Sequence, residues 1–210
     1  MKMKKSNLLE LIKSQKDNFP LDQPFYKNKN IFKIDLRTFF FNQWIFVGHI
    51  SRIPKKGDYF LFSVGKESII IIRENEEKIN SFYNVCRHRG SRICLKNEGR
   101  VRKLICPYHA WGYDLSGKLA NARMMDKNFK PENWSLKKCN SMIFEGLIFI
   151  NLSEKPSDFQ DFITPIQDFI KLHGLGKAKI AARKKYPTKG NWKLALDNFH
   201  ECYHCQPSHP

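Results

Sequence analysis

Short hydrophobic segments recur through the middle of the chain, and turn-forming or polar residues separate them. They are rich in aromatic and β-branched residues, which is typical of strands. The strand-like segments are 58–62, 68–73, 79–85, 102–105, 112–115, 118–119, 142–144 and 147–152. Short strands joined by turns at this spacing predict a mainly β fold, an antiparallel sandwich or small barrel.

Helical spacing replaces this pattern at both ends of the chain. The segments expected to be helical are 1–19, 36–45 (a short helix or a turn), 159–170 and a final stretch that begins near Trp192. Residues 179–183 look strand-like. Because the composition shifts near residue 155, we expect an N-terminal helical arm over residues 1–35, a β domain over 36–155 and a further domain beginning at 156.

The net charge of +17 raises the possibility of nucleic-acid binding. The surplus is spread almost evenly, between +3 and +5 in each of residues 1–50, 51–100, 101–150 and 151–210. A dedicated binding groove would concentrate the charge. We therefore interpret the charge as a general bias of the composition toward lysine and arginine, and expect no nucleic-acid partner.

No secretory signal or membrane span is apparent in the sequence. The Lys-rich start leads into a short run that contains Glu10, and the longest aliphatic run is Ile69 to Ile72. The six cysteines then fit a reducing compartment. We expect a cytoplasmic protein with no membrane contact.

Two short motifs carry the chemistry of the central domain. Cys86 and His88 form the first, and Cys106 and His109 form the second, with seventeen residues between His88 and Cys106. Each motif offers one thiolate and one imidazole. This is the ligand set of a Rieske [2Fe–2S] cluster, in which two cysteines hold one iron and two histidines hold the other. A structural zinc site is the alternative, although zinc fingers usually pair cysteine with cysteine.

The flanks of these motifs, Arg89-Gly90 and Ala110-Trp111-Gly112, resemble the Rieske domains of ring-hydroxylating and demethylating oxygenases. Respiratory Rieske proteins have an extra cysteine in each loop, and these two cysteines form a disulfide. Here the second loop has none, so Cys94 is expected to be a small buried apolar residue. Tyr108 and Trp111 are expected to shield the cluster.

Basic residues gather around the two motifs, and we call them the basic collar. Its members are Arg87, Arg89, Arg92, Arg100, Arg102 and Lys103. The collar would attract an acidic electron donor, such as a ferredoxin or a reductase domain. An ordinary solvated surface explains it equally well.

A second metal motif stands at the end of the sequence. Glu201 and His204 are three residues apart, which in a helix places them on one face. Pro207 is expected to end or kink that helix near Gln206, so that His209 can share a metal with His204. Cys202 and Cys205 could suggest a redox pair, but packing beside the histidines is the simpler interpretation.

This segment resembles the opening of the catalytic domain of Rieske oxygenase α subunits. The resemblance implies that His204 and His209 bind a mononuclear Fe(II), completed by a carboxylate that is absent from this chain. It also implies that Glu201 is no iron ligand but an electron-transfer bridge to a cluster histidine of the neighbouring subunit. Glutamate at this position is more similar to the oxygenases of choline, carnitine and betaines than to ring dioxygenases.

The resemblance implies an oxygenase with a [2Fe–2S] cluster and Fe(II), which uses O₂ to hydroxylate or N-demethylate a small organic substrate. Electrons would come from NAD(P)H through a reductase or ferredoxin, and the subunits would form a homotrimer. Residues 156–210 would be the truncated beginning of an α+β catalytic domain. The chain alone is then expected to be inactive, with the apolar face of 159–170 unpartnered. The alternatives are a Rieske ferredoxin-like electron carrier, an inactive truncated oxygenase and a zinc-binding structural protein.

Overall fold

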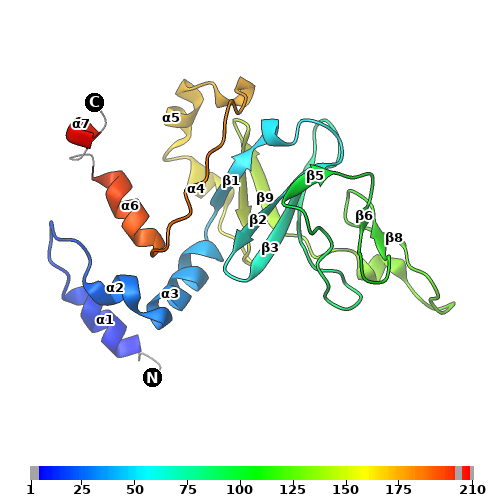
Figure 1. Cartoon of the computed structure of the whole chain (residues 1–210), viewed down its shortest axis with the longest axis horizontal. Helices are drawn as coiled ribbons and strands as arrows, with labels where there is room; N and C mark the ends of the chain where they lie inside the picture. Colours follow the sequence, from blue (N-terminus) through cyan, green and yellow to red (C-terminus); the bar gives the residue numbers. More distant parts are fainter. Residues whose placement is uncertain (1–4, 202–204, 209–210) are drawn as a thin grey trace. The chain divides into compact units, whose positions relative to one another are not determined.

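The computed structural model of this chain describes residues 5–201 and 205–208 (Figure 1). The α-helices are α1 (Lys5–Lys13), α2 (Gln23–Lys27), α3 (Lys29–Asp35), α4 (Phe159–Ile163), α5 (Gln167–Leu172), α6 (Trp192–His200) and α7 (Cys205–Ser208). The strands are β1 (Ile45–His49), β2 (Asp58–Val64), β3 (Glu67–Arg73), β4 (Ile79–Tyr83), β5 (Glu98–Arg100), β6 (Leu104–Ile105), β7 (Gly112–Tyr113), β8 (Leu119–Asn121), β9 (Asn140–Phe144) and β10 (Leu147–Asn151).

The described chain divides into two compact units. Residues 40–182 form one, and the described residues on either side of this range form the other. The first unit contains three antiparallel sheets, with strand orders β1-β10-β9, β4-β3-β2-β5 and β6-β7-β8. The mainly β, antiparallel fold is therefore confirmed, as an open arrangement of sheets and not a closed barrel.

Strand β3 lies at the centre of this unit because both of its faces are buried. Ile69 and Ile71 pack into the cluster of apolar residues that includes Ile148 and Ile150 of β10. Ile70 and Ile72 face a second cluster, which includes the cysteines of both sequence motifs. All four isoleucines of β3 are fully buried. Such continuous apolar runs are typical of strands covered on both sides, and each buried side chain stabilises the fold by about 1.5–3 kcal/mol.

The segment 159–170 forms two helices and not one. Pro165 lies between α4 and α5 and has no N–H to continue the helical hydrogen bonds. Phe159 and Ile163 are buried against Trp44 and Phe149, so the expectation that this face lacks a partner is wrong for α4. Phe169 and Leu172 of α5 are exposed.

The second unit joins the N-terminal helices to α6 through side chains far apart in the sequence. The Tyr26 hydroxyl donates to Asp197 Oδ2 at 2.7 Å, although 171 positions separate the two residues. Lys193 is buried and forms an ion pair with Asp35, also buried. Lys193 Nζ also donates to the Phe25 carbonyl at 3.3 Å. A buried pair of this kind holds α3 and α6 together because either charge alone would be costly to bury.

Several element boundaries differ from the sequence-based expectations. The strand expected to run to Val85 ends at Tyr83, and residues 179–183 belong to no strand. Strands β1 and β5 were not anticipated; β5 is an exposed three-residue edge strand with no apolar pattern. Helix α6 ends at His200, several residues before the expected end near Gln206. Among the described residues, no helix is both long and apolar enough to cross a bilayer.

Candidate functional site

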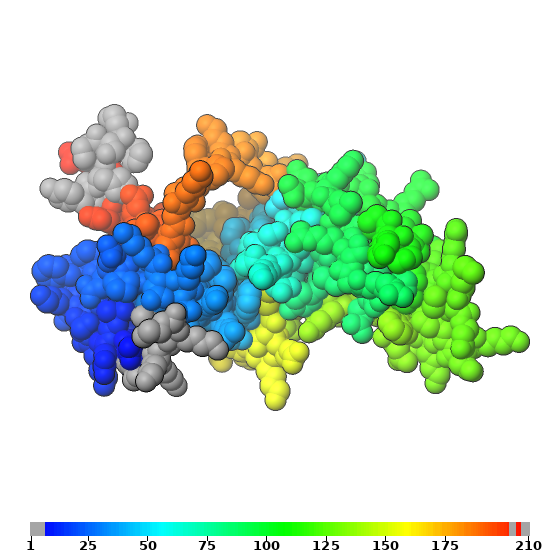
Figure 2. Space-filling view, turned by 60° about the horizontal axis from the view of Figure 1, so that its bottom comes forward, coloured from blue at the N-terminus to red at the C-terminus, as the bar shows by residue number. Residues whose placement is uncertain are grey.

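Two loops at one end of the 40–182 unit carry the first pair of motifs. The first loop follows β4, and its backbone closes on itself around Cys86. The Gly90 N–H donates to the Cys86 carbonyl at 3.0 Å, and the Cys86 N–H donates to the Ser91 carbonyl at 2.8 Å. Gly90 has a φ of 73°, a conformation that glycine adopts at little cost. In the space-filling view, residues 85–135, in green to yellow-green, make up this end of the unit (Figure 2).

The second loop, between β6 and β7, repeats the same backbone pattern. The Ala110 N–H donates to the Cys106 carbonyl at 3.0 Å, and the Cys106 N–H donates to the Trp111 carbonyl at 2.9 Å. Ala110 has a φ of 59°, although an alanine in this region costs about 1–2 kcal/mol. Each loop therefore presents its Cys and His residues through a turn of the same kind, and in the second loop this turn strains the backbone at Ala110.

The loops bring together all four residues that the sequence singled out. Cys86 and Cys106 are buried, each with 2% of its surface exposed, and their side chains interact. The rings of His88 and His109 lie 4.6 Å apart between centroids. His88 is half-buried, and His109 is exposed. The thiols therefore lie inside, while the imidazoles lie at the surface.

The side-chain chemistry of this site fits a bound metal group. His88 Nδ1 is buried and has no hydrogen-bond partner within the described part of the chain. A buried polar atom without a partner is costly, and a ligating ring nitrogen would remove that cost. Across residues 5–201 and 205–208, no three His, Cys, Asp or Glu side chains form a site for a single ion. A [2Fe–2S] cluster takes two protein ligands on each iron, and the two thiols and two imidazoles of these loops fit that ligand set.

Burial sets the protonation of the thiols before any metal binds. Burial and the neighbouring Cys106 raise the pKa of Cys86, while the Tyr113 hydroxyl and the His88 backbone N–H lower it. Burial comes first among these causes, so the free thiol is neutral near pH 7. Burial, His109 and Arg89 also hold the pKa of His88 below its usual value. Iron binding would then release protons from the cysteines, whereas the imidazole of His88 would already be neutral and able to bind iron.

Tyr113 links the two loops at the buried side of the site. Its side chain is fully buried, and its hydroxyl lies 3.3 Å from Cys86 Sγ. The same oxygen accepts the Arg87 N–H at 3.1 Å. Burial and the contact with Cys86 raise the pKa of Tyr113, so the phenol keeps its proton. The phenol can therefore donate a hydrogen bond to a thiolate sulfur at Cys86.

Aromatic rings cover the site, as expected for Trp111 but less so for Tyr108. Trp111 is buried and stacks on His88, with 4.8 Å between ring centroids and 12° between planes. Phe129 and Trp134 pack edge-on against Trp111. Tyr108 is 63% exposed and lies 3.8 Å from the His109 ring. Trp111 therefore limits access of water from one side, and Tyr108 leaves the tip of the site open.

The structure adds Asn84, a residue that the sequence analysis missed. Its side chain is fully buried and, through hydrogen bonds, holds the end of the first loop at Cys94. Asn84 Oδ1 accepts the Cys94 N–H at 2.8 Å, and Nδ2 donates to the Cys94 carbonyl at 2.8 Å. Cys94 is buried beside Tyr59, and burial raises its pKa to about 11. The interpretation of Cys94 as a small buried apolar residue is confirmed. The sequence signal for Asn84 was a polar residue at the end of an apolar segment, two positions before Cys86.

All members of the basic collar are exposed. Arg100 forms an ion pair with Asp58, 2.6 Å from Nε to Oδ1. In the described chain, no ion pair neutralises the other members, which are Arg87, Arg89, Arg92, Arg102 and Lys103. The site therefore opens at a positively charged surface.

The second motif lies mostly outside the described residues, which include Glu201 but not Cys202, His204 or His209. Glu201 is exposed and caps the C-terminus of α6, with a φ of −94° and a ψ of 84°. Helix α6 ends before Glu201, and His204 lies outside the described residues, so the expectation that these two share one helical face stays a prediction. Cys205 is exposed, which contradicts its interpretation as a packing residue. The metal roles of His204 and His209 stay predictions.

Comparison with known families agrees with this site. Residues 43–139 match the family described as the Rieske [2Fe–2S] domain. Residues 175–210 match the ring-hydroxylating α subunit, catalytic domain. The curated relatives include the glycine betaine monooxygenase oxygenase subunit of Pseudomonas aeruginosa, 38% identical over 202 residues, which cover 96% of this chain and 47% of that protein.

Another relative is the carnitine monooxygenase oxygenase subunit of Escherichia coli K12, 35% identical over 194 residues, which cover 89% of this chain and 51% of that protein. Among solved structures, a quaternary ammonium Rieske monooxygenase, studied for carnitine oxidation and inter-subunit electron transfer, is 34% identical with a TM-score of 0.82. The match covers 89% of this chain and 52% of that one. The chain thus spans about half the length of the relatives it matches.

Proposed function

Because this chain belongs to the family of Rieske oxygenase subunits, we propose that its two loops hold a [2Fe–2S] cluster that accepts and passes on single electrons. The four ligands would be Cys86, His88, Cys106 and His109. The observation that carries this assignment is the buried, unpartnered Nδ1 of His88 beside His109, above two buried thiols. The protein contributes the ligand set, the hydrogen bond from Tyr113 and the cover of Trp111.

In the full-length protein, we propose that His204, His209 and a carboxylate from beyond this chain bind a mononuclear Fe(II). When both metal groups are bound, they supply electron storage and O₂ activation for hydroxylation or N-demethylation of a small organic molecule. Glu201 would lie between an iron-bound histidine and a cluster histidine of a neighbouring subunit. Its exposure at the end of α6 leaves the carboxylate accessible to such a neighbour.

The proposed substrate is a small quaternary amine. Support comes from relatives named for glycine betaine and carnitine, and from glutamate at position 201. The inter-subunit electron transfer studied in a similar structure supports a homotrimer in which each cluster serves a neighbour's iron. A ferredoxin or flavin reductase would carry electrons from NAD(P)H. The proposed domain limits stay 1–35, 36–155 and 156–210.

Metal and sulfide analysis after anaerobic purification tests the cluster assignment. We expect two irons and two acid-labile sulfides per chain, since a Rieske cluster contains both. The double variant with Cys86→Ser and Cys106→Ser should lose both. One zinc per chain without labile sulfide would instead identify a structural zinc site. For the full-length protein, O₂ consumption with glycine betaine or carnitine tests the substrate class, and no substrate-dependent consumption would refute it.

A further inference from the structure

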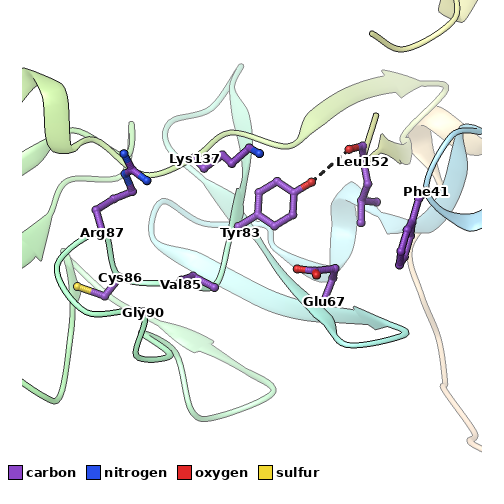
Figure 3. Close-up of a pocket in the computed structure, with 9 residues that line it drawn as sticks. All are labelled: Phe41, Glu67, Tyr83, Val85, Cys86, Arg87, Gly90, Lys137 and Leu152. Atoms are coloured by element: carbon purple, nitrogen blue, oxygen red, sulfur yellow. Dashed lines mark hydrogen bonds between the residues drawn. The ribbon is translucent and has the colours of Figure 1, made fainter. Parts of the chain in front are cut away.

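A groove runs along the 40–182 unit and reaches the site from the side of Cys86. Its volume is about 550 Å³. The residues that line it are Phe41, Glu67, Tyr83, Val85, Cys86, Arg87, Gly90, Lys137 and Leu152. Figure 3 shows the Tyr83 ring at its centre, between Lys137 and Glu67, with Arg87 and Cys86 toward one end. The Tyr83 hydroxyl donates to the Leu152 carbonyl at 3.2 Å, which fixes this ring in the groove.

This groove is a second approach to the site. Cys86 lines it, but neither histidine does. The ring of His109, with Tyr108 beside it, is exposed at the tip of the loops and makes the site accessible there as well. A molecule seated in the groove would therefore lie against a cysteine ligand while the histidine tip stays free.

The groove has the charge and composition of a small protein-binding surface. Arg87 and Lys137 contribute two positive charges against the single carboxylate of Glu67. Lys137 lies 5.4 Å from the centroid of the Tyr83 ring, and its ion pair with the exposed Glu154, at 3.5 Å, is of the weak surface kind. Val85 adds an exposed apolar side chain. An apolar spot within a charged rim is the usual anatomy of an interface, and electron-transfer interfaces are small.

We propose that this groove is the docking site of an acidic one-electron donor protein, so that electrons enter beside Cys86 and leave by the histidine tip. The inference rests on the proposed function, because it requires a cluster in the loops. In the step itself, one electron leaves the reduced donor, which is oxidised, and the cluster is reduced by that electron. No bond is made or broken. The two openings would allow a donor to remain bound while the tip faces another subunit.

The test uses the full-length holoprotein and a reduced plant-type [2Fe–2S] ferredoxin with an acidic surface as the donor. This ferredoxin has a lower reduction potential than Rieske centres, so the transfer is downhill. Lys137→Glu reverses a charge inside the groove. Lys103→Glu is the matched control, because it makes the same charge change in the basic collar outside the groove.

At low salt, we expect Lys137→Glu to weaken ferredoxin binding and slow cluster reduction, each by about tenfold or more. Lys103→Glu should change both by about twofold, and the difference should shrink as salt is added. Reduction by dithionite, which needs no protein interface, should be the same in all three proteins. Binding is measured by calorimetry with both proteins oxidised, and reduction by stopped-flow absorbance.

Three results would overturn the docking site. One is normal binding and reduction of the Lys137→Glu variant, and another is an equal effect of Lys103→Glu, which would reflect attraction by the whole collar. The third is a wild-type protein that neither binds this ferredoxin nor accepts its electrons. A wild-type protein without iron and labile sulfide would instead refute the proposed function, so the two failures are distinguishable.

Discussion

Replacing Tyr113 by phenylalanine should lower the reduction potential of the cluster. The change removes one oxygen, which lies 3.3 Å from Cys86 Sγ and accepts the Arg87 N–H at 3.1 Å. Reduction places more negative charge on the cluster and its sulfur ligands, so a hydrogen bond to sulfur stabilises the reduced state more than the oxidised one. If that difference is about 1 kcal/mol, as for an ordinary hydrogen bond, the potential should fall by about 40 mV.

The same substitution has a separate cost in stability. Tyr113 is fully buried, and its hydroxyl accepts the Arg87 N–H in a partly buried hydrogen bond that the substitution removes. Loss of an ordinary hydrogen bond of this kind costs about 0.5–1.5 kcal/mol. Stability and potential are measured independently, so a small loss of stability does not obscure the shift in potential.

Redox titration followed by circular dichroism measures the potential of wild type and variant. Tyr108→Phe is the matched control, because it removes a phenolic oxygen from an exposed ring of the same loop region. We expect its potential to stay within about 10 mV of wild type, since no hydrogen bond to sulfur is lost. Equal potentials for wild type and Tyr113→Phe would show that the Tyr113 hydroxyl does not interact with the cluster.

Two buried groups and the proposed bridge can each be tested by substitution. Asp35→Ala should lower the free energy of unfolding, measured in urea, by about 3–5 kcal/mol, because it leaves the charge of Lys193 buried without its partner. Asp161→Ala, at an exposed position, is the control and should lower it little. Equal losses in the two variants would refute the pairing of Asp35 with Lys193. Burial raises the pKa of Cys139 from 9.0 to about 12, so the stability that its neutral thiol contributes is complete below pH 9 and is lost between pH 9 and 12. Cys139→Ala should therefore flatten the dependence of the free energy of unfolding on pH in this range. An unchanged slope would contradict the raised pKa. In the full-length protein, Glu201→Ala should leave the cluster spectrum intact and stop substrate turnover, and normal turnover would exclude the bridging role.

The sequence predicted the centre of the fold well because its signals there are local and strong. The run of isoleucines in β3 indicates a strand buried on both faces whatever the neighbours are. The four Cys and His residues could be grouped from their spacing alone, and the two loops do bring them together. Periodicity and motif spacing need no knowledge of tertiary contacts, which is why these predictions agree with the structure.

Features that depend on distant partners could not be predicted in this way. Strand β5 exists because it pairs with β2, and its three exposed residues carry no apolar signal. Asn84 matters through bonds to residues nine and ten positions away. The early end of α6 follows Asn198, Phe199 and His200, which are weaker helix formers than leucine or alanine, but no glycine or proline marks the stop. The break between the two helices of residues 159–170, in contrast, could have been predicted from Pro165.

The proposal on which the others depend is that two cysteines and two histidines of these loops hold one [2Fe–2S] cluster. The most direct test is pulsed electron paramagnetic resonance of the anaerobically purified, dithionite-reduced protein, recorded for ¹⁴N couplings. We expect one paramagnetic cluster coupled to two imidazole nitrogens, with one coupling lost when His109 is replaced by cysteine. A reduced cluster without nitrogen coupling, or a protein with no paramagnetic centre, would contradict it.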